Sequence, residues 1–164
     1  MTKKGRGMSV LGVGLAMGIA GTAAMDVWAL VLNRATGQPL PNWGMVGRWF
    51  GHLPRGTVFH GDIAASDRLE GELPIGWAAH YGVGALYGVV WALIAGAVWL
   101  ADPSFLPVWI FSLLTIAAGW FLLQPGMGLG WAASKTPNPW KVRVLGVLAH
   151  TAFALGMWAA AVVL

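Results

Sequence analysis

Residues 8–33, MSVLGVGLAMGIAGTAAMDVWALVLN, form the stretch that decides the class of fold. It contains a single charged residue, Asp26, and about 20 apolar residues suffice for a helix to cross a bilayer. The sequence therefore predicts a transmembrane helix here. The residues that recur every four positions along it are Gly14, Gly18, Thr22 and Asp26. This spacing places them on one helix face, where small residues allow another helix to approach closely, so Asp26 is predicted to face a neighbouring helix.

The remainder of the chain has the same apolar character. Of 164 residues, 57% are hydrophobic and 10% are charged, whereas an ordinary soluble domain carries about 25% charged residues. A soluble chain this short could not bury so much apolar surface. Residues 74–101, 104–124 and 141–164 predict three further membrane helices. We expect an all-α integral membrane protein, a single domain over residues 1–164, with four transmembrane helices.

Two polar regions flank the first span. They are a basic tail, residues 1–7, and a connection, residues 34–73. Within the connection, residues 43–53 are aromatic and glycine-rich and stop before Pro54, which predicts a short helix lying on the membrane surface. A second interfacial segment is predicted at residues 126–134, because a straight helix over 104–134 would reach ~46 Å, well beyond a ~30 Å hydrocarbon core.

A weak internal repeat is visible. Gly44, Met45 and Trp49 are matched 82 positions later by Gly126, Met127 and Trp131, and the surroundings of His80 resemble those of His150. Two parallel repeats of two helices each would produce this pattern. Chance is an equally good explanation, because alanine, leucine and glycine are common in the chain.

The predicted topology gathers the polar side chains at one membrane face. This face receives Asp26, His80, Gln124 and His150 from the spans, and the connection that carries His52, His60 and Asp62 emerges there. Ionisable residues within membrane spans are costly and usually functional, so Asp26, His80 and His150 are candidate catalytic or binding residues. The alternative is structural: Asp26 bonded to His80 or to Arg143 would hold helices together.

A metal site is the first chemical hypothesis. Imidazole and carboxylate ligands suit zinc, iron or manganese, so the expected cofactor is a divalent transition metal. The candidate ligands are His52, His60, Asp62, His80 and His150. Four unconnected histidines are the alternative, because the chain has no HExxH motif. The absence of cysteine excludes disulfides and thiolate ligands. A haem between His80 and His150 fits poorly with helix faces built for tight packing.

Charge bears on partners and orientation. Arg48, Arg55 and Trp49 are candidate contacts for anionic lipid head groups. Membrane lipids are the expected partners, together with a second copy or a larger membrane complex, whereas no basic stripe of the kind that binds nucleic acid is present. Seven basic residues lie at the histidine-bearing face and three in the tail, which places that face in the cytoplasm.

Several short motifs resemble a known family. They are Met25-Asp26-x-Trp28, Gly47-Arg48-Trp49-x-Gly51-His52-Leu53-Pro54-Arg55-Gly56, Trp77-x-x-His80-Tyr81, Gln124-Pro125-x-Met127-Gly128 and Thr136-Pro137-Asn138-Pro139. This combination looks like a bacterial domain-of-unknown-function family of small multi-pass membrane proteins. The resemblance covers most of the chain and implies a bacterial inner-membrane protein, but it implies no activity.

Three functional hypotheses follow from these observations. The first is a metal-binding protein or metal-assisted membrane enzyme that acts on an amphiphile at the lipid interface. The second is a small oligomeric transporter or channel subunit in which Asp26 is the titrating group. The third is a structural or assembly subunit of a larger membrane complex.

Overall fold

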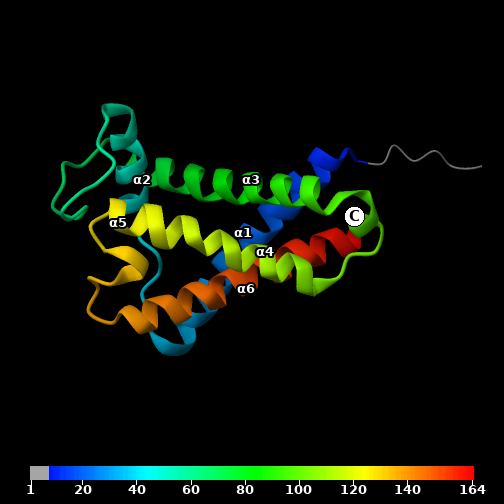
Figure 1. The fold of residues 1–164 in the computed structure, drawn as a ribbon. Coiled ribbons are helices and arrows are strands. Elements are labelled where there is room, and N and C mark those ends of the chain that lie inside the picture. Colours follow the sequence, from blue (N-terminus) through cyan, green and yellow to red (C-terminus); the bar gives the residue numbers. More distant parts are fainter. Residues whose placement is uncertain (1–7) are drawn as a thin grey trace, which may run out of the picture.

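The computed structural model describes residues 8–164, so the predicted basic tail at residues 1–7 lies outside the described residues. Four helices are long and apolar enough to cross a membrane, and they lie side by side in an elongated bundle (Figure 1). They are α1 (Val10–Thr36), α3 (Glu72–Ala101), α4 (Phe105–Ala118, continued to Gly126) and α6 (Pro139–Val163). The predicted all-α fold with four membrane helices is confirmed.

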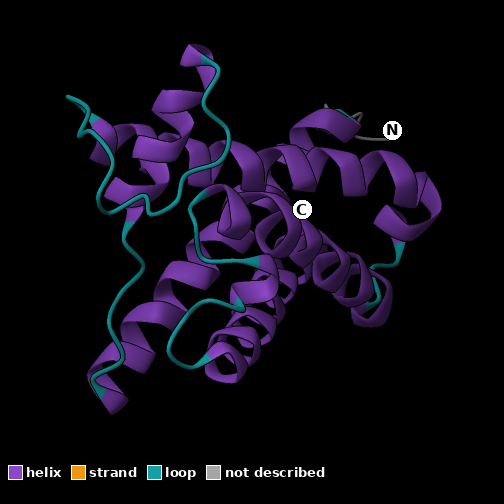
Figure 2. Cartoon of the chain, turned by 60° about the vertical axis from the view of Figure 1, so that its left-hand side comes forward, coloured by secondary structure: helices purple, strands orange, loops and turns teal. Residues whose placement is uncertain are grey.

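The long connections gather at one end of the bundle. That end holds the short helix α2 (Trp43–His52), the turn η1 (Leu53–Arg55), α5 (Gln124–Gly126) and the turn η3 (Trp131–Ala133). The C-terminus and the start of α1 lie at the opposite end (Figure 1). In the view of Figure 2 the long loops lie on one side of the bundle, and the short connection between α3 and α4 lies on the other. We call the loop-bearing end, with α2 and residues 53–71 and 127–138, the polar end.

The central contact of the bundle is made between α1 and α3. A Cβ atom added at Gly14 would lie 2.7 Å from the Cα of Val89, and one added at Gly18 would lie 2.7 Å from the Cα of Ala85. Such distances are far below ordinary van der Waals contact, so only glycine allows the two backbones to approach this closely. The four-residue stripe predicted on the first span thus packs against the matching stripe of α3, which contains Gly84 and Gly88.

The other helices extend this pair. Phe153 and Met157 of α6 pack against Gly21 of α1, and α6 also packs against α4. The apolar core lies in the half of the bundle near the termini. Its buried members are Met17, Trp91, Val108, Phe153, Met157 and Ala161. By their contacts, the four helices follow the order α3, α1, α6, α4. The polar side chains of the helices lie mainly in the half of the bundle away from the termini.

The third span ends close to its predicted bound, but it does so through an unexpected helical turn. Residues Gly119–Leu123 form a π-helical turn (η2), in which the N–H of Gln124 bonds the carbonyl of Gly119, five residues earlier. The helix then continues through Pro125 to Gly126. Residues 126–134 contain turns and η3 rather than an interfacial helix like α2, and Ala132 has a left-handed φ of 46°. The two interfacial segments are therefore unlike, and this difference gives the predicted two-helix repeat no support.

The contact between α1 and α3 generates a first prediction. In Gly84→Ala, the new methyl group would collide with the hydroxyl of Thr22 and lie only 3.2 Å from its Cβ, against the face of α1 that contains Gly18. Overpacking of a tight contact costs about 1–3 kcal/mol, so the variant should unfold at a lower denaturant concentration in mixed micelles. Gly82→Ala is the matched control, because no atom lies within 4 Å of its added Cβ. Equal stability of the two variants would contradict the close contact.

Candidate functional site

Asp26 and His80 meet inside the polar half of the bundle. The Nε2 atom of His80 lies 3.1 Å from Oδ1 of Asp26, and the hydroxyl of Tyr81 donates to Oδ2 at 2.8 Å. The contact follows from helix geometry, because Asp26 is one helical turn beyond Thr22 and His80 is one turn before Gly84. The predicted structural pairing of Asp26 with His80 is therefore observed. The two side chains also form one wall of a pocket.

The pocket lies between α1, the connection before α2, and α6. Its volume is about 280 Å³, and most of its lining is apolar. Asp26 and His80 supply the charged and titratable groups of the wall, and Trp43 stacks on the imidazole of His80 with a centroid distance of 3.8 Å. The apolar lining includes Met25, Trp28, Ala29, Leu32, Val142, Leu145 and Ala149. This is a mostly apolar cavity with one ionisable pair at its edge, which is the usual form of a small-molecule site.

Arg48 has a different role from the one its sequence suggested. Its side chain is buried, and it forms a two-pronged ion pair with Glu72, with N–O distances of 2.8 and 2.9 Å. Its Nη1 also donates to the carbonyl oxygens of Ile63, Ala64 and Ser66. The hydrogen bond to Glu72 raises the pKa of Arg48 above its ordinary value, while burial acts in the opposite direction. Arg48 therefore ties α2, the start of α3 and residues 63–66 together.

Trp49 is also turned into the protein. Its side chain is buried and its indole N–H donates to the carbonyl of Val58 at 2.8 Å. Of the three predicted lipid contacts, Arg55 alone is exposed. Arg48 and Trp49 instead hold the loop after α2, because their donors reach backbone carbonyls of that loop.

His52 and His60 form a directly bonded pair. Their Nδ1 and Nε2 atoms are 2.8 Å apart, and Nδ1 of His60 lies 3.0 Å from the carbonyl of Gly126. Since a carbonyl only accepts, His60 donates through Nδ1. Doubly protonated rings would place two N–H donors face to face, so the observed pairing requires a neutral ring in at least one of them. The pair lines an open cavity of about 370 Å³ that also includes Arg55 and Asp67.

The loop that carries this pair covers the end of α4 and α5. The N–H of His60 donates to the carbonyl of Gly126, and the N–H of Ile63 donates to that of Met127. A Cβ at Gly126 would lie 2.9 Å from Cε2 of Trp49, so glycine is needed where the two segments meet. This loop does not line the pocket beside Asp26. The residues between α1 and α3 that line that pocket are Gln38, Pro39, Pro41 and Trp43.

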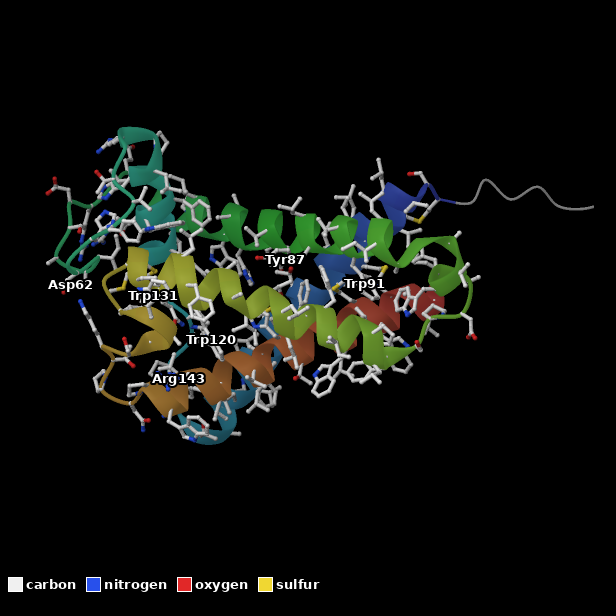
Figure 3. The ribbon with its side chains drawn as sticks, in the orientation of Figure 1. Asp62, Tyr87, Trp91, Trp120, Trp131 and Arg143 are labelled. Carbon is white, nitrogen blue, oxygen red and sulfur yellow. The ribbon has the colours of Figure 1, made fainter. Side chains whose placement is uncertain are left out.

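The predicted metal ligands do not converge. Within residues 8–164, no three side chains of His, Cys, Asp or Glu are grouped as a metal centre would require. Asp62 is exposed at the tip of the loop (Figure 3), where it accepts a hydrogen bond from the N–H of Ala64. His80 bonds Asp26, and His150 bonds the carbonyl of Gly146 within its own helix. The arrangement gives a single metal centre no support, and the metal assignment stays a prediction.

The remaining predicted residues are dispersed. Gln124 lies on α5 and lines neither cavity that contains His80, and its buried Oε1 has no hydrogen-bond partner among the described residues. Arg143 donates to the carbonyl of Ala132 rather than to Asp26. His150 faces a second, smaller cavity, which it shares with His80.

Three residues of the site were not singled out from sequence. Tyr81 completes the hydrogen bonds of Asp26, Trp43 covers His80, and Glu72 neutralises Arg48. Adjacency to His80 was an available signal for Tyr81. Trp43 and Glu72 are distant from their partners along the chain, so helical spacing could not have connected them.

Residues 15–164 match the model of a family described as "Protein of unknown function (DUF2938)". The chain belongs to the DUF2938 family. The matched segment contains every residue of the Asp26 site and of the Arg48 and His52 clusters. No curated protein and no solved structure matches this DUF2938 chain. The family membership thus carries no activity with it, and function has to be argued from the geometry.

The buried Arg48 gives a second prediction. In Arg48→Met, Glu72 loses its partner and three carbonyl groups lose a donor. Breaking a buried ion pair by removing one partner costs about 3–5 kcal/mol, so we expect a large loss of stability and faster trypsin cleavage after Arg68. Arg55→Met removes an exposed arginine of the same connection and should leave both measurements unchanged. Similar cleavage rates in the two variants would show that Arg48 does not hold the loop.

Proposed function

We propose that this chain is a multi-pass membrane protein that binds a small amphiphile at its polar end, with the polar group of the ligand on Asp26. The observation that carries this proposal is the cavity of about 280 Å³ that combines an apolar lining with the Asp26–His80 pair. Small-molecule sites usually have volumes of about 300–1,000 Å³, so the ligand or its buried part is small.

The chemistry of the carboxylate indicates what the polar group should be. Each oxygen of Asp26 already accepts one hydrogen bond, from His80 or from Tyr81, and each keeps further acceptor capacity. The side chain of Asp26 is 22% exposed, so it is accessible in the cavity. An acceptor of this kind favours a ligand that supplies a donor, namely a hydroxyl or an ammonium group. A ligand carboxylate would be repelled.

The apolar part of the ligand would lie between α1 and α6. Leu32 of α1 and Val142 and Leu145 of α6 line the cavity there. These helices are membrane-spanning in length and composition, so an amphiphile dissolved in the bilayer can reach the cavity sideways. Burial of apolar surface contributes roughly 25 cal/mol per Å², which would make binding depend on chain length. Membrane lipids and lipid-derived molecules are therefore the proposed partners.

A homologous ligand series tests the proposal. The probes are decylamine, 1-decanol and decanoate, added to protein in lipid nanodiscs that carries 5-fluorotryptophan. The ¹⁹F resonance of Trp43, assigned with Trp43→Phe, should shift saturably with the amine and the alcohol and not with decanoate. Asp26→Asn should weaken binding of the amine by about tenfold or more. Hydrogen bonds to charged groups contribute about 1.5–3 kcal/mol, and a loss of about 1.4 kcal/mol lowers affinity tenfold.

Asp62→Asn is the control for this series, because it removes an exposed carboxylate far from the cavity. It should bind all three probes as the wild type does. Equal shifts for the three probes, or binding of the amine that is unaffected by Asp26→Asn, would overturn the proposal.

We further propose that the protein resides in the inner membrane of a bacterium with its polar end in the cytoplasm. The apolar helices support a membrane location, and the orientation is supported by the distribution of basic residues, seven of which lie near the polar end. The cysteine-free chain permits a direct test with a membrane-impermeant maleimide. Asp102→Cys, at the turn between α3 and α4, should be labelled in intact spheroplasts, whereas Asp62→Cys should be labelled only after permeabilisation. The reverse pattern would overturn the orientation.

A further inference from the structure

A second cavity lies deeper in the bundle, on the other side of His80. Its volume is about 60 Å³, and all four long helices contribute to its lining. Tyr87, which marks its position in the middle of the bundle, is labelled in Figure 3. The lining residues with polar atoms are Thr22, His80, Tyr87, Thr115 and His150. His80 lines both cavities, so its imidazole stands between the amphiphile pocket and this inner space.

Some of the polar groups that line this cavity form hydrogen bonds within their own helices. The hydroxyl of Thr22 donates to the carbonyl of Gly18, and that of Thr115 donates to the carbonyl of Ser112. His150 uses Nδ1 on the carbonyl of Gly146. Three groups are left over: Nδ1 of His80, Nε2 of His150 and the hydroxyl of Tyr87 make no hydrogen bond among residues 8–164, and none of them is among the fully buried unpaired atoms, so a water molecule can reach each one.

These three groups need partners. An unpaired polar group in an apolar surrounding costs at least about 1–3 kcal/mol, and in membrane proteins buried backbone and side-chain groups are satisfied internally or by water. A cavity holds a water molecule when it offers about 10–15 Å³ and two or more polar partners. The inner cavity exceeds both requirements, so it is suited to a small cluster of water molecules.

The positions of the hydrogen atoms on the two imidazole rings also favour water in the inner cavity. His80 presents Nε2 to the carboxylate of Asp26, and His150 presents Nδ1 to a carbonyl; both of these nitrogens therefore carry hydrogen. In the neutral rings, Nδ1 of His80 and Nε2 of His150 are then acceptors. Two acceptors cannot bond each other, whereas a water molecule supplies two donors and can bridge them.

We propose that the inner cavity holds water that connects His80 to His150 and relays protons between them. A proton that arrives at His80 places hydrogen on its Nδ1, which donates to the bridging water. The water passes a proton to Nε2 of His150, and His80 returns to the neutral form. At His80 one N–H bond breaks as an O–H bond forms on the water, and a different O–H bond of that water breaks as an N–H bond forms at His150. The water is unchanged overall, and a single positive charge moves inward.

The charges around this path are few. α1 contributes Asp26, and α3 contributes His80, Tyr81 and Tyr87; on α4 the cavity is lined by Thr115 and on α6 by His150. Towards the termini the path is closed by the apolar core around Met17, Trp91 and Val108. Because this core offers no further titratable group, the relay couples protonation at Asp26 and His80 to the middle of the bundle rather than conducting across the membrane.

Water-edited solid-state NMR on protein in lipid vesicles tests the hydration. The ring signals of His150 and Tyr87 should gain polarisation from water several-fold faster than the side-chain signals of Val108, which is fully buried in the apolar core. His60, which lines the open cavity at the polar end, provides the fast reference in the same sample. Build-up at His150 as slow as at Val108 would show a dry cavity and overturn the proposal.

Two variants separate the relay from mere hydration. His150→Leu replaces the inner acceptor with an apolar side chain, and His150→Gln keeps a polar acceptor of similar length. We expect the ¹⁵N signal of Nδ1 in His80 to lose its exchange broadening with water in His150→Leu and to keep it in His150→Gln. Leu148→Ala, on the lipid-facing side of α6, should leave the signal unchanged. Unchanged broadening in His150→Leu would overturn the relay.

Binding of decylamine is measured separately, so failure here does not decide the amphiphile proposal.

Discussion

The close contact of α1 with α3 is the constraint on which the rest of the structure depends. Gly14 and Gly18 bring the two backbones together, and the same four-residue spacing then carries Asp26 to His80. In lipid no hydrophobic force drives helices together, so packing of small residues and interhelical hydrogen bonds must do so. The Asp26–His80 bond is therefore at once a product of this packing and a contribution to it.

The sequence predicted the parts of this structure that depend on hydrophobicity and periodicity. Four spans and the facing of Asp26 toward another helix follow from apolar length and spacing. The short helix predicted over residues 43–53 follows from its composition and from Pro54, and it is observed over Trp43–His52. The prediction missed features that depend on contacts between distant segments. Sequence alone predicts Arg48 to be a lipid contact, because nothing along the chain shows that Glu72 and three carbonyl groups surround it. The predicted third span ends at residue 124, whereas the helix continues after the π turn through Pro125 to Gly126.

The polar end divides into two assemblies with different roles. Arg48, Trp49 and the His52–His60 pair organise loops over the end of α4 and α5, with donors directed mostly to backbone carbonyls. Asp26, His80 and Tyr81 keep side-chain groups available to cavities. A single histidine-rich centre could be expected from topology alone, because topology specifies which face a residue is on and not its depth or its rotation about the helix.

The π turn at Gly119–Leu123 has a consequence for how this fold tolerates change in length. A π turn accommodates one more residue than an α-helical turn needs. Deleting one residue there would restore a regular helix and leave everything beyond it in nearly the same orientation. A deletion in the regular part of α4 would instead rotate everything beyond it by roughly 100°, the angle per residue of an α-helix. Gly126 would then leave Trp49 and His60, and the loop would lose its contact with α5. The π turn is therefore the place in this membrane-spanning helix where a change of one residue in length disturbs the polar end least.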